Sequence, residues 1–186
     1  SLHLERLQAS ARTLGFACGM STLSSLLADE AARWPTGVLR VRLGLNHAGC
    51  CRVVATPLDE DPVREWRVTI ADETLAADDY LLRHKTTARA RYDRALAALA
   101  ARPEVFDVIF LNDRGEVCEG ARSNIFVECN GVLLTPPLCC GLLPGVLRRK
   151  LLASGRAVER VLRLDDLRRS AAVYEVSALS GLMPVT

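Results

Sequence analysis

The sequence predicts an α+β protein with two domains, a small N-terminal domain over residues 1–82 and a larger, strand-rich domain over residues 83–186. Apolar side chains recur at helical spacing through the first 33 residues. Apolar and polar residues then alternate, which is the period of a strand. The second half holds several short strand-like segments separated by Gly-containing turns, with helices between them. A chain of 186 residues is long enough for one large domain or two small ones.

Two helices are expected to open the chain, at 2–15 and at about 21–33. Leucines line one face of the first, and Ser21 is a residue type that caps helices such as the second. Residues 38–57 should form a hairpin around the turn "NHAG", because apolar residues alternate before this turn and two valines follow it. The stretch "REWRVTIA", 64–71, predicts a third strand, and an acidic linker ends the domain. Because the chain starts inside a helix and without Met, we expect that an N-terminal piece is missing.

The second domain should combine a strand-rich core with peripheral helices. Asn-Gly in "CNG" is typical of a hairpin loop. Pro and Gly at the start of "PGVLRRKLLASG", and Gly at its end, are typical of a helix. The expected elements are a helix at about 86–101, a strand at 106–113, a hairpin at 124–137, a helix at 144–155, a strand at 157–164, a short helix at 164–171 and a strand at 172–185 that leaves into a turn.

Composition argues against several classes of partner. The formal net charge is +2, and arginines are interleaved with acidic residues, so nothing indicates a nucleic-acid partner. No apolar run approaches the roughly 20 residues that cross a bilayer, and no signal-peptide pattern is present. The seven cysteines include two adjacent pairs, a spacing that suits neither an ordinary disulfide nor a zinc site. We therefore expect a cytoplasmic protein with reduced cysteines and without a membrane or metal partner.

Lys85 is the first candidate functional residue. The chain has 24 basic residues, of which only Lys85 and Lys150 are lysines. Arginine stays protonated in proteins, whereas a desolvated lysine can lose its proton and attack a carbonyl carbon. Lys85 is therefore a candidate for imine chemistry, and chance placement of two lysines is the alternative.

Three further stretches hold candidate binding residues. In "EVCEGARSNIF", Glu119 precedes Gly120, where the backbone can approach a ligand closely; ordinary turn chemistry is the alternative. In "GLLPGVLRRKLL", Gly and Pro precede a helix whose first N–H groups can bind a phosphate, although many ordinary helices begin in this way. In "VSALSGLMPV", small residues follow a strand and can supply further N–H and hydroxyl donors.

In this order and at this spacing, the four stretches resemble the class IV, or fold-type IV, pyridoxal-phosphate enzymes. These include branched-chain aminotransferases, D-amino-acid aminotransferases and 4-amino-4-deoxychorismate lyases. The resemblance runs from "HLERL" to "MPV". It implies the two-domain fold of the D-amino-acid aminotransferase type, with the start of the small domain missing. It also implies pyridoxal 5'-phosphate as cofactor, a small-molecule amino substrate and a homodimer with sites between the domains.

The resemblance assigns a role to individual residues. Lys85 matches the lysine that forms the Schiff base with the cofactor and shuttles protons. Glu119 matches the carboxylate that pairs with the pyridine nitrogen, and Arg6 matches the arginine that binds the cofactor phosphate. The other matched positions contact the cofactor ring or phosphate, and these are Asn124, Leu143, Gly145, Val146, Leu147, Ser177 and Ala178.

Of three departures from the family pattern, two remove hydroxyl contacts to the cofactor phosphate and the third favours a lyase. Positions 147 and 178 are Leu and Ala, where many aminotransferases have Thr. The ending "SALSGLMPV" also lacks the Glu that aminotransferases usually place before the final Pro-Val. The interpretation is therefore a 4-amino-4-deoxychorismate lyase, which releases 4-aminobenzoate and pyruvate in the folate pathway. The alternatives are a branched-chain or D-amino-acid-type aminotransferase and a catalytically degenerate binding protein of the same fold.

Overall fold

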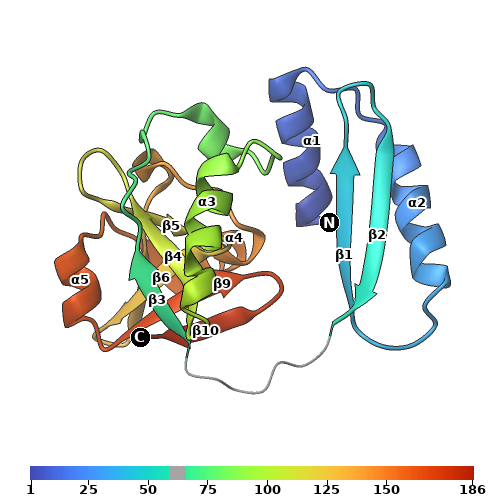
Figure 1. The fold of residues 1–186 in the computed structure, drawn as a ribbon. Helices are drawn as coiled ribbons and strands as arrows, with labels where there is room; N and C mark the ends of the chain where they lie inside the picture. Colours follow the sequence, from blue (N-terminus) through green and yellow to red (C-terminus); the bar gives the residue numbers. More distant parts are fainter. Residues whose placement is uncertain (59–65) are drawn as a thin grey trace. The chain divides into compact units, whose positions relative to one another are not determined.

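The computed structural model describes residues 1–58 and 66–186. The chain forms two compact units, Ser1–Val63 and Arg64–Thr186 (Figure 1). The domain boundary expected after residue 82 lies inside the second unit, because the strand that precedes it pairs within that unit. Each unit has its own secondary structure and is described by itself.

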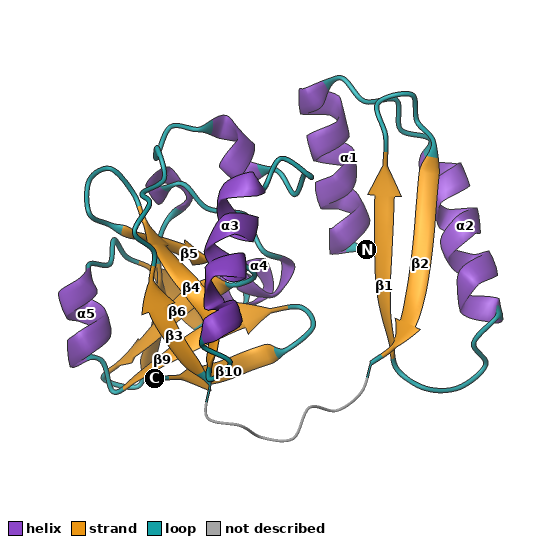
Figure 2. Cartoon of the chain, in the orientation of Figure 1, coloured by secondary structure: helices purple, strands orange, loops and turns teal. Residues whose placement is uncertain are grey.

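The first unit consists of two helices and a hairpin, α1 (Leu2–Leu14), α2 (Met20–Ala32), β1 (Leu39–Leu45) and β2 (Cys51–Pro57). Helix α1 ends at Gly15, whose φ of 73° is the left-handed conformation that favours Gly. Helix α2 begins directly after Gly19, so Ser21 lies inside the helix and does not cap it. Strands β1 and β2 pair antiparallel, as expected (Figure 2). Asn46 closes their turn, because its Oδ1 accepts the backbone N–H of Cys50 at 2.8 Å.

The second unit is built on an eight-stranded sheet of order β10-β9-β6-β5-β4-β3, with β7 pairing β6 and β8. Its strands are β3 (Arg67–Ile70), β4 (Val105–Leu111), β5 (Val117–Gly120), β6 (Asn124–Cys129), β7 (Val132–Thr135), β8 (Ala157–Glu159), β9 (Ala172–Ser177) and β10 (Gly181–Val185). The sheet curls until its two edges meet. Thr186 donates its N–H to the Trp66 carbonyl at 2.9 Å and accepts the Val68 N–H at 2.9 Å. The first two residues of the strand expected at 64–71 lie outside the described residues.

Helices cover this sheet (Figure 2). They are the 3₁₀ helices η1 (Tyr80–Arg83), η2 (Leu99–Ala101) and η3 (Leu138–Cys140) and the α-helices α3 (Ala90–Ala98), α4 (Val146–Ala153) and α5 (Leu164–Arg169). Side chains of β4 alternate between two cores, as the pleat requires. Val108 and Phe110 pack with Leu96 and Leu99 of the α3–η2 segment, whereas Ile109 packs with a second cluster around strands β5 and β6. Burying one such side chain contributes roughly 1.5–3 kcal/mol.

The α+β fold is confirmed, and three element predictions were wrong in detail. The helix expected from residue 86 begins at Ala90, because turns precede it and the Thr86 hydroxyl accepts the Ala88 N–H at 3.1 Å. The strand expected at 157–164 ends after three residues, since the chain departs to bury Leu162 completely. The strand expected at 172–185 is a hairpin, whose second strand starts at Gly181 with a φ of 71°.

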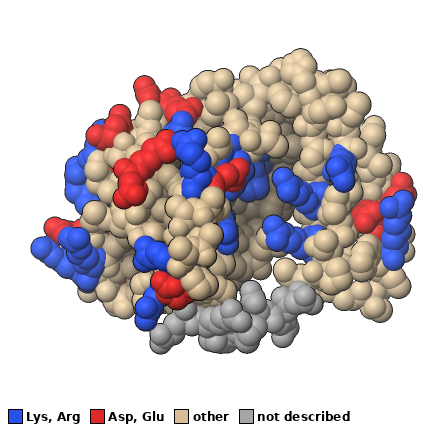
Figure 3. Space-filling model, viewed as in Figure 1, with Lys and Arg blue, Asp and Glu red and all other residues tan. Residues whose placement is uncertain are grey.

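The surface charges and the cysteines are those of an ordinary folded domain. Basic and acidic side chains lie interspersed on the face of the second unit that Figure 3 shows, in keeping with the small net charge. All seven cysteines are free thiols. In the described part of the chain, no helix has the length and apolar character that a bilayer-spanning helix requires.

Candidate active site

Glu119 is a buried acid of the second unit. It lies on β5 opposite Asn124 of β6, and only 6% of it is exposed. Its Oε1 accepts a hydrogen bond from the Tyr92 hydroxyl at 2.7 Å, and its Oε2 accepts the backbone N–H of Leu143 at 2.9 Å. These donors come from α3 and from the loop before α4, so two separate elements fix the orientation of one carboxylate.

The pKa of Glu119 is raised to about 7. Burial is the main cause, and the negative charge of Asp107 adds to it. The N–H of Leu143, the hydroxyl of Tyr92 and the ammonium of Lys85 act in the opposite direction. Glu119 is thus close to half-protonated at neutral pH, and a cationic or N–H-bearing ligand would favour its carboxylate. A strongly shifted pKa of this kind is typical of functional sites.

Asn124 and Gly145 form a close contact beside Glu119. The Asn124 side-chain N–H₂ donates to the Leu143 carbonyl at 2.9 Å, and the Gly145 N–H donates to the same carbonyl at 2.8 Å. A Cβ at position 145 would lie 1.9 Å from the Asn124 Oδ1, so no residue other than Gly fits there without displacement. This contact sets the point at which the chain enters α4.

The start of α4 can receive an anion. Gly145 caps the helix without a side-chain hydrogen bond, and the first backbone N–H groups of a helix lack intrahelical partners. Val146 and Leu147 carry two of these N–H groups. The Leu147 side chain itself packs against the Phe126 and Val176 cluster, so it faces the core. Backbone N–H groups at the positive end of a helix dipole suit a phosphate.

The turn after β9 lies next to Asn124, because Val176 pairs with Asn124. The Ser177 hydroxyl accepts the backbone N–H groups of Leu179 at 3.2 Å and Ser180 at 3.1 Å. It also shares a hydrogen bond with the Ser180 hydroxyl at 2.7 Å. Ala178 is exposed in this turn. Helix α4 packs against β9, so the turn and the start of α4 belong to one region.

Lys85 belongs to the same unit as this region, whereas Arg6 belongs to the other unit. Lys85 lies between η1 and α3 in the second unit; it is exposed, and its ammonium is near enough to lower the pKa of Glu119. Arg6 lies on α1 in the first unit and is half-buried. The second unit therefore contains every predicted site residue except Arg6, whose place beside them stays a prediction.

Residues 1–186 match the model of the amino-transferase class IV family over their whole length. The chain belongs to this family. Class IV aminotransferases and their lyase relatives depend on pyridoxal 5'-phosphate, so this class IV chain is a pyridoxal-phosphate-dependent enzyme. The resemblance that the sequence suggested is confirmed at this level.

Relatives of this class IV enzyme carry names of two kinds. A protein of Schizosaccharomyces pombe, provisionally named aminodeoxychorismate lyase, is 29% identical over 92% of this chain and 76% of its own length. A branched-chain aminotransferase of Thermotoga maritima, also provisionally named, is 33% identical over 44% of this chain and 32% of its own length. The crystal structure of a protein of Mesorhizobium loti, provisionally named an amino-acid aminotransferase, matches with a TM-score of 0.93 and 39% identity. That match covers 99% of this chain and 89% of the other.

Tyr92 is the residue of this candidate site that sequence reasoning missed. Its hydroxyl donates to Glu119, and its ring packs edge-on against Phe110 with centroids 5.0 Å apart. A signal was present in the sequence. Tyr92 heads an apolar stripe with Ala95, Leu96 and Leu99, and a tyrosine whose ring is buried needs a partner for its hydroxyl.

Two further buried acids, Asp107 and Glu175, lie against the backbone at Gly120, directly after Glu119. Both are 0% exposed. A Cβ at Gly120 would lie 2.7 Å from Asp107 Oδ2 and 3.1 Å from Glu175 Oε1, so these oxygens pack directly against the backbone after Glu119. Asp107 Oδ2 also accepts the Arg122 N–H at 3.1 Å. Burial and the neighbouring Asp107 charge raise the pKa of Glu175 to about 9, so Glu175 is protonated at neutral pH.

We expect Glu175→Gln to flatten the pH dependence of stability. Because the folded-state pKa of Glu175 lies above its ordinary value of 4.5, the acid stabilises the fold fully below about pH 4.5 and loses this contribution as the pH rises to about 9. The slope in that window is about 1.4 kcal/mol per pH unit for one proton. Gln mimics the protonated acid, so the unfolding free energy of the variant, measured with urea, should depend on pH less steeply by this amount. The exposed Glu104→Gln is the control, and an unchanged slope in Glu175→Gln would contradict the assignment.

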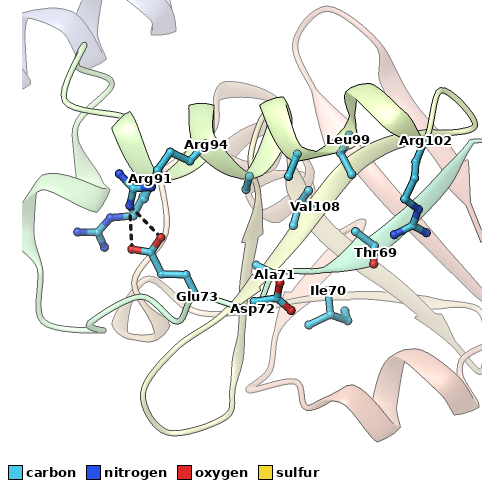
Figure 4. A pocket seen from close by; sticks show the side chains of 12 residues that line it. Thr69, Ile70, Ala71, Asp72, Glu73, Arg91, Arg94, Leu99, Arg102 and Val108 are labelled. Carbon is cyan, nitrogen blue, oxygen red and sulfur yellow. Dashed lines mark hydrogen bonds and ion pairs between the residues drawn. The ribbon is translucent and has the colours of Figure 1, made fainter.

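A groove of about 330 Å³ lies elsewhere on the second unit, between β3 and α3 (Figure 4). Among the described residues that line it, none is a predicted site residue. Arg94 at its rim is paired with Glu73 at 3.0 Å, and Arg91 is paired with Asp79 at 3.4 Å. No group of three or more potential metal ligands occurs in residues 1–58 and 66–186.

Proposed function

We propose that this enzyme is a 4-amino-4-deoxychorismate lyase, which converts its substrate into 4-aminobenzoate and pyruvate in the folate pathway. The observation that carries the proposal is the turn between β9 and β10. Its sequence, "SALSG", has no carboxylate where aminotransferases of the family usually have Glu. The Schizosaccharomyces pombe relative, which covers nearly the whole chain, carries the lyase name as well.

The residues of the second unit fit pyridoxal phosphate. A buried carboxylate that is half-protonated at neutral pH suits the pyridine nitrogen, because an N–H⁺ group would donate to the carboxylate and stabilise its ionised form. The start of α4 and the Ser177 turn supply N–H and hydroxyl groups of the kind that hold a phosphate. We propose that Arg6 adds the positive charge from the first unit.

The residues of the site then divide the work. When bound, pyridoxal phosphate supplies an aromatic ring that withdraws electrons from bonds next to the substrate amine. Lys85 would hold the cofactor covalently, and its amine would accept and return protons as general base and acid. Glu119 would hold the ring nitrogen protonated. Asn124 fixes the Leu143–Gly145 segment, and the Leu143 side chain would contact the ring and exclude water.

An aminotransferase of the branched-chain or D-amino-acid type is the second candidate function. The Mesorhizobium loti and Thermotoga maritima relatives favour it by name. Lys85 and Glu119 serve both activities, so they do not separate them. The catalytically degenerate binding protein is the weakest alternative. A buried carboxylate with a pKa near 7, held by two hydrogen bonds, lowers the stability of the fold, and a protein without catalytic chemistry has no use for it.

Product analysis tests the choice between the two activities. We expect the protein loaded with pyridoxal phosphate to form equal amounts of 4-aminobenzoate and pyruvate from 4-amino-4-deoxychorismate. A parallel panel of L- and D-amino acids with 2-oxoglutarate should give no glutamate. Transamination of that panel without any 4-aminobenzoate would overturn the lyase proposal and leave the family assignment intact.

We further propose that the protein is a homodimer and that it is cytoplasmic. Light scattering of the purified protein measures whether it is a dimer.

A further inference from the structure

We propose that Tyr92 is a positioning residue that favours the ionised form of Glu119, and thereby helps to keep the shared proton on the ring nitrogen of the cofactor. The inference rests on the proposed role of Glu119 as the partner of that nitrogen. It assigns Tyr92 a task in the reaction, which Tyr92 performs through its hydrogen bond to Glu119.

The contact between the two side chains has the form of a charge-assisted hydrogen bond. The Tyr92 hydroxyl lies 2.7 Å from Glu119 Oε1, whereas the other oxygen, Oε2, is occupied by the Leu143 N–H. A phenol that donates to a carboxylate stabilises the ionised form of that carboxylate. Each oxygen of Glu119 thus receives one protein donor and keeps further lone-pair capacity for a ligand N–H.

The hydroxyl is held in place by the packing of its ring. Phe110, which is 0% exposed, packs edge-on against the Tyr92 ring, and the Arg89 guanidinium lies over it, 5.5 Å from the centroid. Arg89 is itself fixed, because it donates to the Asp93 carboxylate at 2.7 Å and to the Ala121 carbonyl at 3.1 Å. A hydroxyl held in this way loses little freedom when it bonds to Glu119, and it cannot turn to another acceptor without repacking the core.

The electrostatic environment makes Tyr92 a donor throughout the physiological pH range. Burial and the charge of Glu119 raise the pKa of Tyr92 well above its ordinary value, with Arg91 opposing and Cys118 adding to the effect. The charged groups that act on Glu119 are Lys85, which favours its ionised form, and Asp107, which opposes it. The Tyr92 hydroxyl and the Lys85 ammonium therefore both favour the ionised form of the buried Glu119.

One proton is shared between Glu119 and the ring nitrogen, so stabilising the carboxylate places that proton on the ring. Hydrogen bonds to charged groups shift such an equilibrium by roughly 10- to 100-fold. A protonated ring withdraws electrons more strongly than a neutral ring. Loss of the Tyr92 hydroxyl should therefore slow the reaction by a similar factor without loosening the binding of substrate.

The test compares Tyr92→Phe with Tyr174→Phe. Tyr174 is a matched control, because its hydroxyl also donates to a carboxylate, Glu128, at 2.9 Å. In the unloaded proteins, infrared titration of the Glu119 carboxyl should show a pKa higher in Tyr92→Phe by one to two pH units than in the wild type. In proteins loaded with cofactor labelled by ¹⁵N at the ring, the nitrogen resonance of Tyr92→Phe alone should move toward that of the unprotonated ring. Its kcat should fall roughly 10- to 100-fold at nearly constant KM.

The outcomes separate this inference from the proposed function. Fallen activity with an unmoved nitrogen resonance and an unmoved Glu119 titration would show a merely structural role and overturn the inference. A raised Glu119 titration in a protein that binds no cofactor would uphold the contact and overturn the proposed function. Should Tyr92→Phe fail to fold, 3-fluorotyrosine can be incorporated at position 92 alone, in a variant that carries Tyr80→Phe and Tyr174→Phe. The pKa of Glu119 should then be lower than in the same variant with ordinary tyrosine. The fluorinated phenol is a stronger donor, and an unchanged Glu119 titration would then contradict the inference.

Discussion

Replacing Lys85 by Ala is expected to lower turnover by roughly 10⁴-fold or more, because one residue both attaches the cofactor and transfers protons. The variant should also lose covalent attachment. Reduction of the loaded wild type with borohydride should add the mass of the cofactor to the peptide that contains Lys85. The same treatment of Lys85→Ala should add none. Lys85 is exposed and lies outside the sheet, so the fold should tolerate the change.

The composition of the chain supplies the control for this experiment. Lys150 is the only other lysine, and it lies exposed on α4. Lys150→Ala should keep wild-type activity and the same mass addition at Lys85. Attachment at Lys150, or full turnover by Lys85→Ala, would show that the reactive amine was assigned to the wrong residue.

The parts of the fold that sequence could predict are those fixed by local chemistry. Leucines at helical spacing and a Gly beyond the last turn determine α1, and alternation around an Asn-Gly-containing turn determines the β6–β7 hairpin. Pro and Gly before α4 likewise indicated its start. Each of these signals lies within a few residues of the element that it predicts.

The parts that sequence could not predict depend on distant partners. Strand β10 was missed because its alternation is weak and its pairing with β9 follows from the curl of the sheet. Strand β5 was not predicted, since four residues carry too little pattern, and it is β4 and β6 that pair with it on its two sides. The apolar Leu162 was assigned to a strand, but it lies in a loop, and its side chain is buried.

The candidate site shows the same division. Glu119 and Gly145 were identified through the resemblance to a family, which fixes positions but not environments. The pKa near 7 of Glu119 depends on burial, on the Leu143 N–H and on Tyr92, and these come from three segments far apart in sequence. The clash that excludes a side chain at Gly145 depends on Asn124, 21 positions earlier.

Replacing Glu119 by Gln is expected to lower kcat by roughly 10²–10⁴-fold while the empty protein becomes more stable above neutral pH. Gln has nearly the same shape, but it is neutral and cannot hold a proton on the ring nitrogen. Glu119 has a folded-state pKa of about 7 against an ordinary value of 4.5, so its contribution to stability is complete below about pH 4.5 and is lost as the pH rises to about 7. A neutral side chain removes that loss.

Two measurements on Glu119→Gln check the expected loss of activity and the expected gain in stability. Turnover of the loaded enzyme should fall, while the urea-unfolding free energy of the unloaded variant at pH 8 should exceed that of the wild type by roughly 1–3 kcal/mol. Glu128→Gln is the control, because Glu128 also accepts a tyrosine hydroxyl, that of Tyr174 at 2.9 Å, and lies outside the site. It should change neither quantity appreciably. If Glu119→Gln lost activity and stability together, the buried carboxylate would be a structural residue, because the fold would then depend on its negative charge.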